Sequence, residues 1–410
     1  MQAQVPERRR RPLRAVAATS GVIALLAAAV GGCGGGDGSA TTSAADTPSG
    51  TPVKVMTYAD ITVTPPAPSA KFITESVKAA IDAANARGGI NGHPIDLITC
   101  DTKMNPNAAT TCGRQAVQER VVAVVGGESL FDAQIATLVE RAGIPMIGPI
   151  PLSPPVFNGA LTYCHTAQTS TTLNMLPKIA GQVGVRKLSL IINGGTPITQ
   201  LNIDAFKRGT AAAGLEVGNI VTPSAQTTNF TAAATEAAAN GADGVIVLPL
   251  IQTASIAQQI KEQAPDLKII LPSFVFSFGG DWPTSLNGTT VVTAVQPPTA
   301  TNVPGIKRYR ADMEKYAPAT DLTETSAYEW LAGDWFVRVA REIHGDVTSQ
   351  SIVAAMNGLH DFDMGGITPP YDSAKRGKVA VEKCGENGTV VQAELRDNLL
   401  YAVDPGKFVE

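Results

Sequence analysis

Few side chains in this sequence have the types and spacing that catalysis requires. Cys164 stands next to His165, the residue types of a cysteine nucleophile and its base, and Asp361 and Asp363 could act as paired carboxylates. An oxidised cysteine beside a strand-end histidine is the better interpretation of the first pair. The two aspartates flank an aromatic residue in a Gly/Pro-rich loop, where solvated carboxylates are common. We therefore expect neither pair to be catalytic.

Motifs that mark an enzyme or a cofactor site are missing as well. The sequence has no G-x-S-x-G elbow, no H-E-x-x-H motif and no G-x-x-x-x-G-K-[ST] phosphate loop. Gly126 and Gly127 follow an apolar run, but without the G-x-G-x-x-G spacing of a dinucleotide loop. The histidines are scattered, and no two cysteines have the two-residue spacing of a zinc site. The sequence predicts a protein that is not an enzyme and holds no cofactor or metal.

One cysteine has a context that favours a covalent modification. Five arginines between positions 8 and 14 precede an uncharged, mostly apolar run from Ala15 to Val30. This pattern is typical of a secretory signal peptide, and the run is shorter than the roughly 20 residues of a membrane-spanning helix. Val30-Gly31-Gly32-Cys33 resembles the lipobox of bacterial lipoproteins, whose cysteine is acylated and becomes the new N-terminus. We expect residues 1–32 to be a lipoprotein signal peptide and Cys33 to anchor the protein in the cell membrane, at its extracytoplasmic face. An ordinary secretory signal with a chance cysteine is the alternative.

The size and charge of the remaining chain narrow the possible partners. Removal of residues 1–32 leaves 378 of the 410 residues, which is too long for one ordinary core and predicts two domains. The removed segment holds five arginines and one glutamate, so 27 basic and 35 acidic residues remain and the formal charge becomes −8. No basic patch stands out, and we expect no nucleic-acid partner. Residues 33–52 are rich in Gly, Ser, Thr and Ala, and are expected to form a flexible tether.

The cysteines that follow Cys33 favour two disulfides. An even number of cysteines outside the cytoplasm is typical of paired thiols, and four cysteines allow three pairings. Cys100 ends a predicted strand and Cys112 lies in the first turns of the next helix, so a local bridge between them is expected. Cys164 and Cys384 would then pair by elimination, although the sequence leaves open whether they are bonded.

Apolar strands alternate with amphipathic helices along most of the chain. The alternation begins at the strand Val53–Tyr58, includes a helix over Glu128–Ala142, and starts again after residue 165. One of the last strands is expected at 378–383. Uninterrupted Val/Ile runs between helices predict parallel strands that are covered on both faces. The fold class is therefore α/β, with two Rossmann-like lobes, and ligands of such sheets bind at the carboxyl ends of the strands.

The stretch from Ala79 to Cys100 resembles the early helix, turn and strand of type I periplasmic-binding proteins. It is most similar to the Leu/Ile/Val-binding branch of ABC importers, above all at Asn85 and at Gly88-Gly89-Ile90-Asn91-Gly92. The resemblance continues through Asn105–Ala108, Val121–Gly126 and Ala142–Ile147, and in all it covers about residues 53–400.

The resemblance implies two lobes joined by three crossovers, with a ligand cleft between them. The crossovers would fall near 166–170, 295–298 and 365–371. Lobe 1 would then consist of residues 53–166 and 297–368, and lobe 2 of residues 167–296 and 369–410.

At the positions where the resemblance implies ligand contacts, this chain is largely apolar. The Ser-rich loop of the amino acid receptors corresponds to Gly127–Phe131, which keeps a single serine. An acidic residue that would hold an ammonium group corresponds to Ser273, and a buried cation without a partner is costly. An α-amino acid is therefore not the expected ligand, and a neutral or aromatic organic molecule suits the apolar lining better.

The predicted ligand-binding residues are Tyr58, Ser129, Phe131, Leu152, Ser153, Leu250, Ser273 and Phe274. Glu128 and Gln252 are further polar candidates. Some of these candidates have an alternative interpretation in which they do not bind a ligand. Glu128 could instead lie at a helix N-terminus, where its charge favours the helix dipole, and the aromatic run Phe274–Trp282 could pack on the core of its own lobe.

These observations together predict a lipid-anchored, extracytoplasmic solute-binding receptor of an ABC importer. It would capture a small organic ligand other than a standard branched-chain amino acid by clamshell closure, and pass that ligand to a membrane permease. The alternative is an extracytoplasmic sensor that uses the same fold to signal to a membrane partner. The sequence does not identify the ligand.

Overall fold

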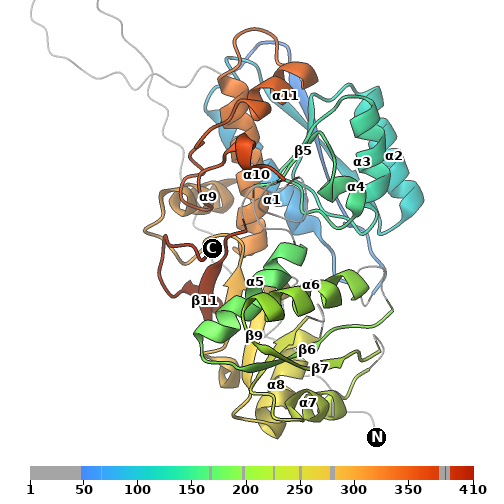
Figure 1. Cartoon of the computed structure of the whole chain (residues 1–410). Helices are drawn as coiled ribbons and strands as arrows, with labels where there is room; N and C mark the ends of the chain where they lie inside the picture. Colours follow the sequence, from blue (N-terminus) through green and yellow to red (C-terminus); the bar gives the residue numbers. More distant parts are fainter. Residues whose placement is uncertain are drawn as a thin grey trace, which may run out of the picture. The chain divides into compact units, whose positions relative to one another are not determined.

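The structure, a computed structural model, describes residues 48–65, 67–165, 169–195, 199–224, 227–248, 252–277, 282–377, 384 and 388–410. Several sequence predictions fall outside these residues: the signal peptide 1–32, the lipidated Cys33, most of the tether 33–52, part of the crossover near 166–170, the ligand contact Leu250 and the strand at 378–383. The described chain forms two α/β units, each built around one sheet (Figure 1).

The first sheet has five parallel strands in the order β2-β1-β3-β4-β5. They are β1 (Val53–Ala59), β2 (Ile95–Asp101), β3 (Ala123–Val125), β4 (Met146–Ile147) and β5 (Thr162–Tyr163). Val55 and Met56 are neighbours in β1, and both are fully buried, in cores on opposite faces of the sheet. The strand is therefore covered on both sides, as its continuous apolar sequence predicts.

Helices cover the two faces of this sheet. One face carries α1 (Lys71–Ala86), α9 (Pro304–Tyr316) and α10 (Glu324–Arg341), and α11 (Ser349–Asn357) contacts α10. The other face carries α2 (Pro106–Gln118), α3 (Asp132–Arg141) and the short α4 (Pro154–Phe157). Helix α10 is buried along nearly its whole length, and its Trp330 and Trp335 are fully buried. It forms the central part of the first core.

The second sheet has seven strands in the order β12-β11-β10-β9-β8-β6-β7. They are β6 (Lys187–Ile191), β7 (Glu216–Val221), β8 (Gly244–Val247), β9 (Lys268–Pro272), β10 (Thr290–Thr293), β11 (Val391–Arg396) and β12 (Leu399–Ala402). Strands β6 to β10 are parallel, whereas β11 and β12 are antiparallel to their neighbours.

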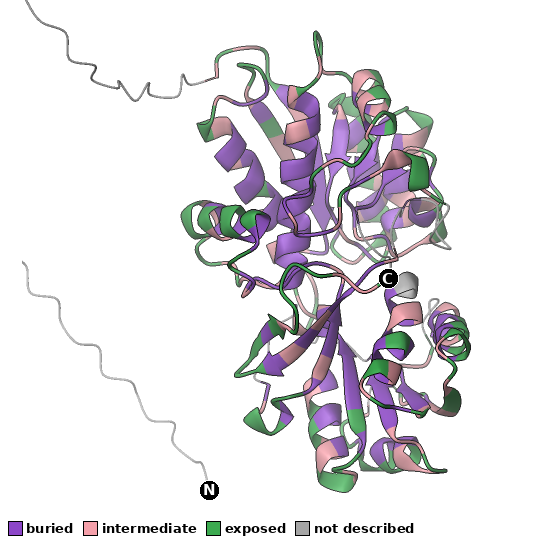
Figure 2. Ribbon diagram, turned by 60° about the vertical axis from the view of Figure 1, so that its left-hand side comes forward, coloured by how far each residue is buried: buried purple, intermediate pink, exposed green. Residues whose placement is uncertain are grey.

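Helices pack on both faces of the second sheet as well. One face carries α5 (Thr169–Gln182) and α6 (Thr199–Ala212), and the other carries α7 (Thr231–Ala238) and α8 (Thr253–Gln263). The 3₁₀ turns are η1 (Ser273–Phe276), η2 (Thr284–Leu286) and η3 (Ser373–Lys375). Figure 2 shows buried residues along the strands and exposed residues on the outward helix faces, which is the layered arrangement expected of an α/β protein.

The chain passes between the two units more than once. After β10 it returns to the first core, where Val303 and Ile306 are buried, and it enters the second sheet again at β11. The Gln296 amide donates to the Ile367 carbonyl (2.9 Å), so two connecting segments run side by side. Tyr371, beyond the boundary predicted after residue 368, packs in the first core against Trp335.

Both expected disulfides are present. Cys100 at the end of β2 is bonded to Cys112 in α2, and Cys164 after β5 is bonded to Cys384. The second bridge is supported by backbone contacts, since the Cys164 amide donates to the Cys384 carbonyl (2.9 Å) and the Cys384 amide donates to that of Phe157 (2.8 Å). The bridge attaches the returning segment to the first unit.

One helix begins later than the sequence predicts. The helix expected over Glu128–Ala142 is α3, which starts only at Asp132. Gly126 and Gly127 have φ values of 61° and 106°, which no right-handed helix allows. Beyond them the Glu128 amide donates to the Tyr58 carbonyl (3.2 Å) and the Leu130 amide donates to the Asp60 carboxylate (3.2 Å). Residues 126–131 therefore form a loop, the β3–α3 loop, at the carboxyl end of the sheet.

None of the helices in the described residues is both long and apolar enough to cross a membrane.

Candidate functional site

Polar side chains gather where the strands of the first sheet end. Asp60 follows β1, and its carboxylate accepts hydrogen bonds from the hydroxyls of Thr102 (2.5 Å) and Ser129 (3.0 Å). It also accepts from the backbone amides of Met104 (2.8 Å) and Leu130 (3.2 Å). Asp60 thereby joins the ends of β1 and β2 to the β3–α3 loop, and Ser129 is used in this contact.

The β3–α3 loop lies tightly between Tyr58 and α10. A Cβ atom on Gly127 would lie 2.6 Å from the Tyr58 ring, and one on Gly126 would lie 2.2 Å from Glu329 Oε2. The Gly127 amide donates to the same Glu329 oxygen (2.8 Å). Only glycine permits this approach, so the glycine pair that suggested a nucleotide loop instead brings a buried carboxylate against the backbone.

Burial shifts the pKa values of three carboxylates at this loop. Burial, with added repulsion from Asp60 and Asp132, raises the pKa of Glu128 from 4.5 to about 7. Burial likewise raises the pKa of Asp132 from 3.8 to about 6. The pKa of Glu329 is raised well above its ordinary value, also chiefly by burial, although the Gly127 amide opposes the shift. In the part of the chain that the structure describes, none of these carboxylates forms an ion pair.

Oxygen atoms without a hydrogen-bond partner among the described residues lie at this end of the sheet, and they include Tyr58 Oη and Glu329 Oε1. The Ser153 hydroxyl interacts with the Asp132 carboxylate and opposes the rise in its pKa. Tyr58, Asp132 and Glu329 are fully buried. Buried polar atoms without partners are uncommon in folded proteins because each costs about 1–3 kcal/mol. Their concentration at the carboxyl end of a parallel sheet is typical of a site that a ligand completes.

The structure brings five of the predicted ligand-binding residues together at this end. Tyr58 lies one residue before the end of β1, and its carbonyl accepts a hydrogen bond from the Glu128 amide (3.2 Å). Ser129 and Phe131 belong to the β3–α3 loop. Leu152 and Ser153 lie beside it, because the Leu152 amide donates to Asp132 Oδ2 (2.8 Å).

These residues differ in how far their side chains are exposed to solvent. Phe131, Leu152 and Ser153 are half-buried, whereas Tyr58 and Ser129 are buried. Glu128 is also half-buried and lies four residues before α3 begins. It is not in the first turn of that helix, and the helix-dipole alternative therefore does not apply to it.

The predicted contacts from the second unit lie at the end of β9. Ser273 is buried, and Phe274 is half-buried against the cores on both faces of the second sheet. Phe276 stacks on Trp282 with ring centroids 4.0 Å apart. The described part of the aromatic run therefore packs on its own unit, as the alternative interpretation expects, and a ligand contact by Phe274 stays a prediction.

An acidic side chain reaches the Ser273 region from another part of the chain. Glu324, at the start of α10, accepts a hydrogen bond from the Ser277 hydroxyl (3.1 Å) and is buried. Burial raises the pKa of Glu324 to about 7, and the hydroxyls around it, Ser273 included, oppose the shift. The acid that is missing at position 273 thus has a counterpart nearby.

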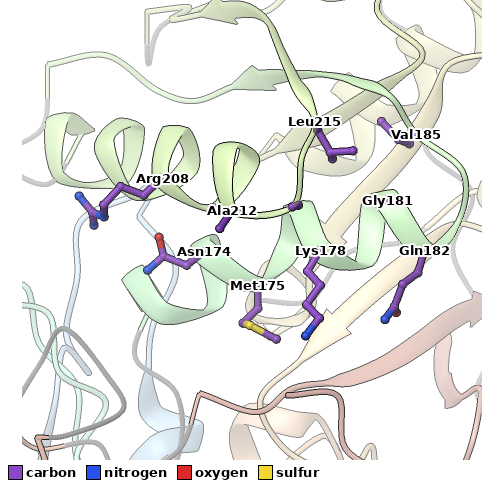
Figure 3. Close-up of a pocket in the computed structure, with 11 residues that line it drawn as sticks. Asn174, Met175, Lys178, Gly181, Gln182, Val185, Arg208, Ala212 and Leu215 are labelled. Carbon is purple, nitrogen blue, oxygen red and sulfur yellow. The ribbon is translucent and has the colours of Figure 1, made fainter.

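A groove on the second unit involves none of the predicted residues. It lies between α5 and α6, has a volume of about 820 Å³, and is lined by Asn174, Met175, Lys178, Gly181, Gln182, Val185, Arg208, Gly209, Ala212, Ala213 and Leu215 (Figure 3). Small residues leave the space between the two helices, and Lys178 contacts the backbone carbonyl of Glu410. The groove has no unpartnered buried carboxylate, unlike the end of the first sheet.

The structure agrees with the expectation that the Cys164–His165 pair is not a nucleophile and base. Cys164 is disulfide-bonded, and His165 is buried against the Tyr328 ring at a centroid distance of 4.1 Å. Burial lowers the pKa of His165 to about 3, so the ring is neutral. No group of three or more His, Cys, Asp or Glu side chains in the described ranges is placed to hold a metal ion.

Sequence reasoning missed Asp60, Asp132, Glu329 and Glu324. Asp60 could have been found, because it directly follows a buried strand whose carboxyl end belongs to a predicted ligand edge. Glu329 was also detectable as a carboxylate inside a helix that is otherwise rich in aromatic and small apolar residues. The convergence of these acids on one loop depends on the packing of α10, which the sequence does not show.

Comparisons with known proteins agree with this architecture. A family model for periplasmic binding proteins matches residues 53–392. A search of curated proteins finds no match. Among solved structures, an extracellular ligand-binding receptor from Verminephrobacter eiseniae is 15% identical, with a TM-score of 0.70 over 86% of this chain and 100% of that one.

Two further structures carry ligands. An ABC transporter solute-binding protein from R. palustris, in complex with 4-hydroxybenzoate, is 17% identical with a TM-score of 0.67 over 87% of this chain and 97% of that one. A branched-chain amino acid transporter substrate-binding protein from Streptococcus pneumoniae, in complex with isoleucine, has the same identity and TM-score and covers 87% of this chain and 100% of its own. All of them share the two-lobed fold.

Proposed function

Because this chain belongs to the periplasmic binding protein family, we propose that it is an extracytoplasmic receptor that delivers a small organic solute to the permease of an ABC importer. The solute is a molecule other than a standard branched-chain amino acid. The observation that carries the proposal is the family match over residues 53–392, in a chain with the two-lobed fold of type I periplasmic binding proteins. Members of this fold bind ligands at the carboxyl ends of their strands, which is where this chain places its unpartnered polar atoms.

The predicted contacts supply both the apolar and the polar part of such a site. Phe131 and Leu152 are half-buried next to Ser153, and Ser273 and Phe274 lie at the end of β9 in the second unit. Contacts from two units that form only on closure would stabilise the liganded state. Lipidation at Cys33 would keep the receptor beside its permease, and the tether of residues 33–52 would give it reach.

The related structures show that this fold accommodates different ligands, since one holds 4-hydroxybenzoate and another isoleucine. A thermal-shift screen of the mature chain against small metabolites tests the proposal. One class of organic molecule should raise the melting temperature as ligand concentration rises. If leucine, isoleucine or valine gave the largest increase, the exclusion of branched-chain amino acids would be wrong. If no small molecule raised it, the receptor function would be contradicted.

A sensor of the same fold is the alternative function. Deletion of the partner permease separates the two, because an importer's receptor supports uptake of its labelled ligand only when the permease is present. Uptake that is unchanged without the chain, together with a ligand-dependent transcriptional response that needs it, would favour the sensor.

A further inference from the structure

No cationic side chain of the described residues pairs with the carboxylates at the end of the first sheet. We call Asp60, Glu128, Asp132 and Glu329 the acidic cluster. Burial, and after it the charges of all four acids, which lie close enough to act on the Tyr58 hydroxyl, raise the pKa of Tyr58. None is paired with a Lys, Arg or His of the described residues. Like charges this close together, without a counter-ion, are unfavourable.

Hydrogen bonding within the protein explains only part of the acidic cluster. Asp60 is used fully, because it holds the ends of two strands and the β3–α3 loop. Asp132 interacts with the Leu152 amide and the Ser153 hydroxyl, whereas Glu329 uses one oxygen toward the Gly127 amide and leaves the other without a partner. The Tyr58 hydroxyl is fully buried among these acids and also has no partner. A purely structural cluster would be expected to satisfy these atoms.

Glu128 is the member of the acidic cluster that a ligand can reach first. It is the half-buried one, whereas Asp60, Asp132 and Glu329 are buried. Its backbone is fixed against β1 by the hydrogen bond to the Tyr58 carbonyl. Leu152 and Ser153, which lie against Asp132, are also half-buried, and the Ser153 hydroxyl interacts with the Asp132 carboxylate. The accessible edge therefore combines one carboxylate, an acceptor hydroxyl and apolar side chains.

The chemistry of these atoms selects among ligand classes. A carboxylate on the ligand would be repelled by the ionised members of the acidic cluster, and a neutral molecule would leave the charge of those members uncompensated. A quaternary ammonium group would compensate charge but has no N–H to donate to the unpartnered oxygens. A primary ammonium or guanidinium group compensates the charge and also donates N–H groups to these oxygens.

We propose that the ligand of this receptor is a small organic cation, whose ammonium or guanidinium group is held by Glu128 and Asp132 and whose apolar part lies against Phe131 and Leu152. The proposal rests on the receptor function and specifies its substrate class. It replaces the expectation of a neutral ligand, which considered only the missing acid at Ser273. The structure supplies the acids from the β3–α3 loop and from the two helices, α3 and α10, that pack on either face of the first sheet.

The test uses the mature chain and a panel of small amines and guanidines, each paired with a neutral analogue. 2-Phenylethylamine is paired with 2-phenylethanol, its neutral isostere, and with phenylalanine, which adds a carboxylate. Agmatine represents the guanidines. Calorimetry should find a cation that binds at least about ten-fold more tightly than its neutral partner. Glu128→Gln should weaken the binding of that cation by at least about ten-fold, and Asp132→Asn should weaken its binding as well.

The control variant is Glu314→Gln, an exposed glutamate of α9, which should bind like the unchanged chain. Unliganded melting curves establish that each variant is folded. If neutral or anionic compounds bind best and Glu128→Gln leaves their affinity unchanged, the cation proposal is wrong and the receptor function stands. If no compound of any charge binds, the receptor function itself is contradicted.

Discussion

Replacement of Glu128 by glutamine should make the unliganded protein more stable at neutral pH. The carboxyl has a pKa of about 7 in the folded chain against an ordinary value of 4.5. Between these two values the folded state binds more protons than the unfolded state, so the free energy of unfolding falls as pH rises. At about 1.4 kcal/mol per pKa unit the full effect would be about 3 kcal/mol. Because the side chain is half-buried, solvent screening reduces it to about 1–2 kcal/mol.

Thermal unfolding at two pH values measures this effect. At roughly 2.1 cal/mol/K per residue, a chain of this length gains about 1 °C in melting temperature per kcal/mol. Glu128→Gln should therefore melt about 1–3 °C higher than the unchanged chain at pH 7.5, with a smaller gain at pH 5, where the folded carboxyl is already neutral. Glu314→Gln should show no such pH dependence. A loss of stability at pH 7.5, or an equal gain at both pH values, would refute the conclusion that burial and repulsion raise the pKa of Glu128.

Three further outcomes follow from particular contacts. Gly127→Ala should lower stability by about 2–4 kcal/mol, because its Cβ would meet the Tyr58 ring at 2.6 Å. Gly345 has a similar φ but open space around it, so Gly345→Ala should cost less stability. Equal denaturant midpoints for the two variants would show that the ring contact is unimportant. Replacing both cysteines of the Cys164–Cys384 bridge with serine should cost about 5 kcal/mol of stability, against about 3 kcal/mol for the Cys100–Cys112 bridge. The difference follows from their sequence separations of 220 and 12. A larger loss of stability for the short bridge in urea titrations would contradict this ranking. Cys33→Ala should release the protein from the membrane fraction, and unchanged fractionation would exclude the lipid anchor.

The sequence predicted most of the fold because the local patterns agree with the packing. The apolar run Val53–Tyr58 located β1, and the α/β class and both disulfides are those expected from the sequence. The start of α3 was wrong, because contacts with Tyr58, Asp60 and Glu329 hold residues 126–131 in a loop. The contact between Gly127 and Glu329 joins residues about 200 positions apart in the chain, which no local pattern records.

The candidate site was predicted only in part, for a similar reason. Tyr58 lies next to the end of β1, and Ser129 and Ser153 follow β3 and β4, so a strand-end rule could select them. Glu329 lies in the middle of a helix, and Glu324 approaches the end of β9 from the start of the same helix. The position-by-position comparison at Ser273 found a missing acid, but could not show acids that come from other elements.

The central claim is that this chain binds a small organic solute reversibly and without turnover. Isothermal titration calorimetry of the mature chain with the most stabilising compound of the screen, followed by mass spectrometry of the recovered compound, tests it most directly. We predict one binding site per chain, and recovery of the compound unchanged. The absence of saturable binding, or the recovery of a chemically altered compound, would contradict the account.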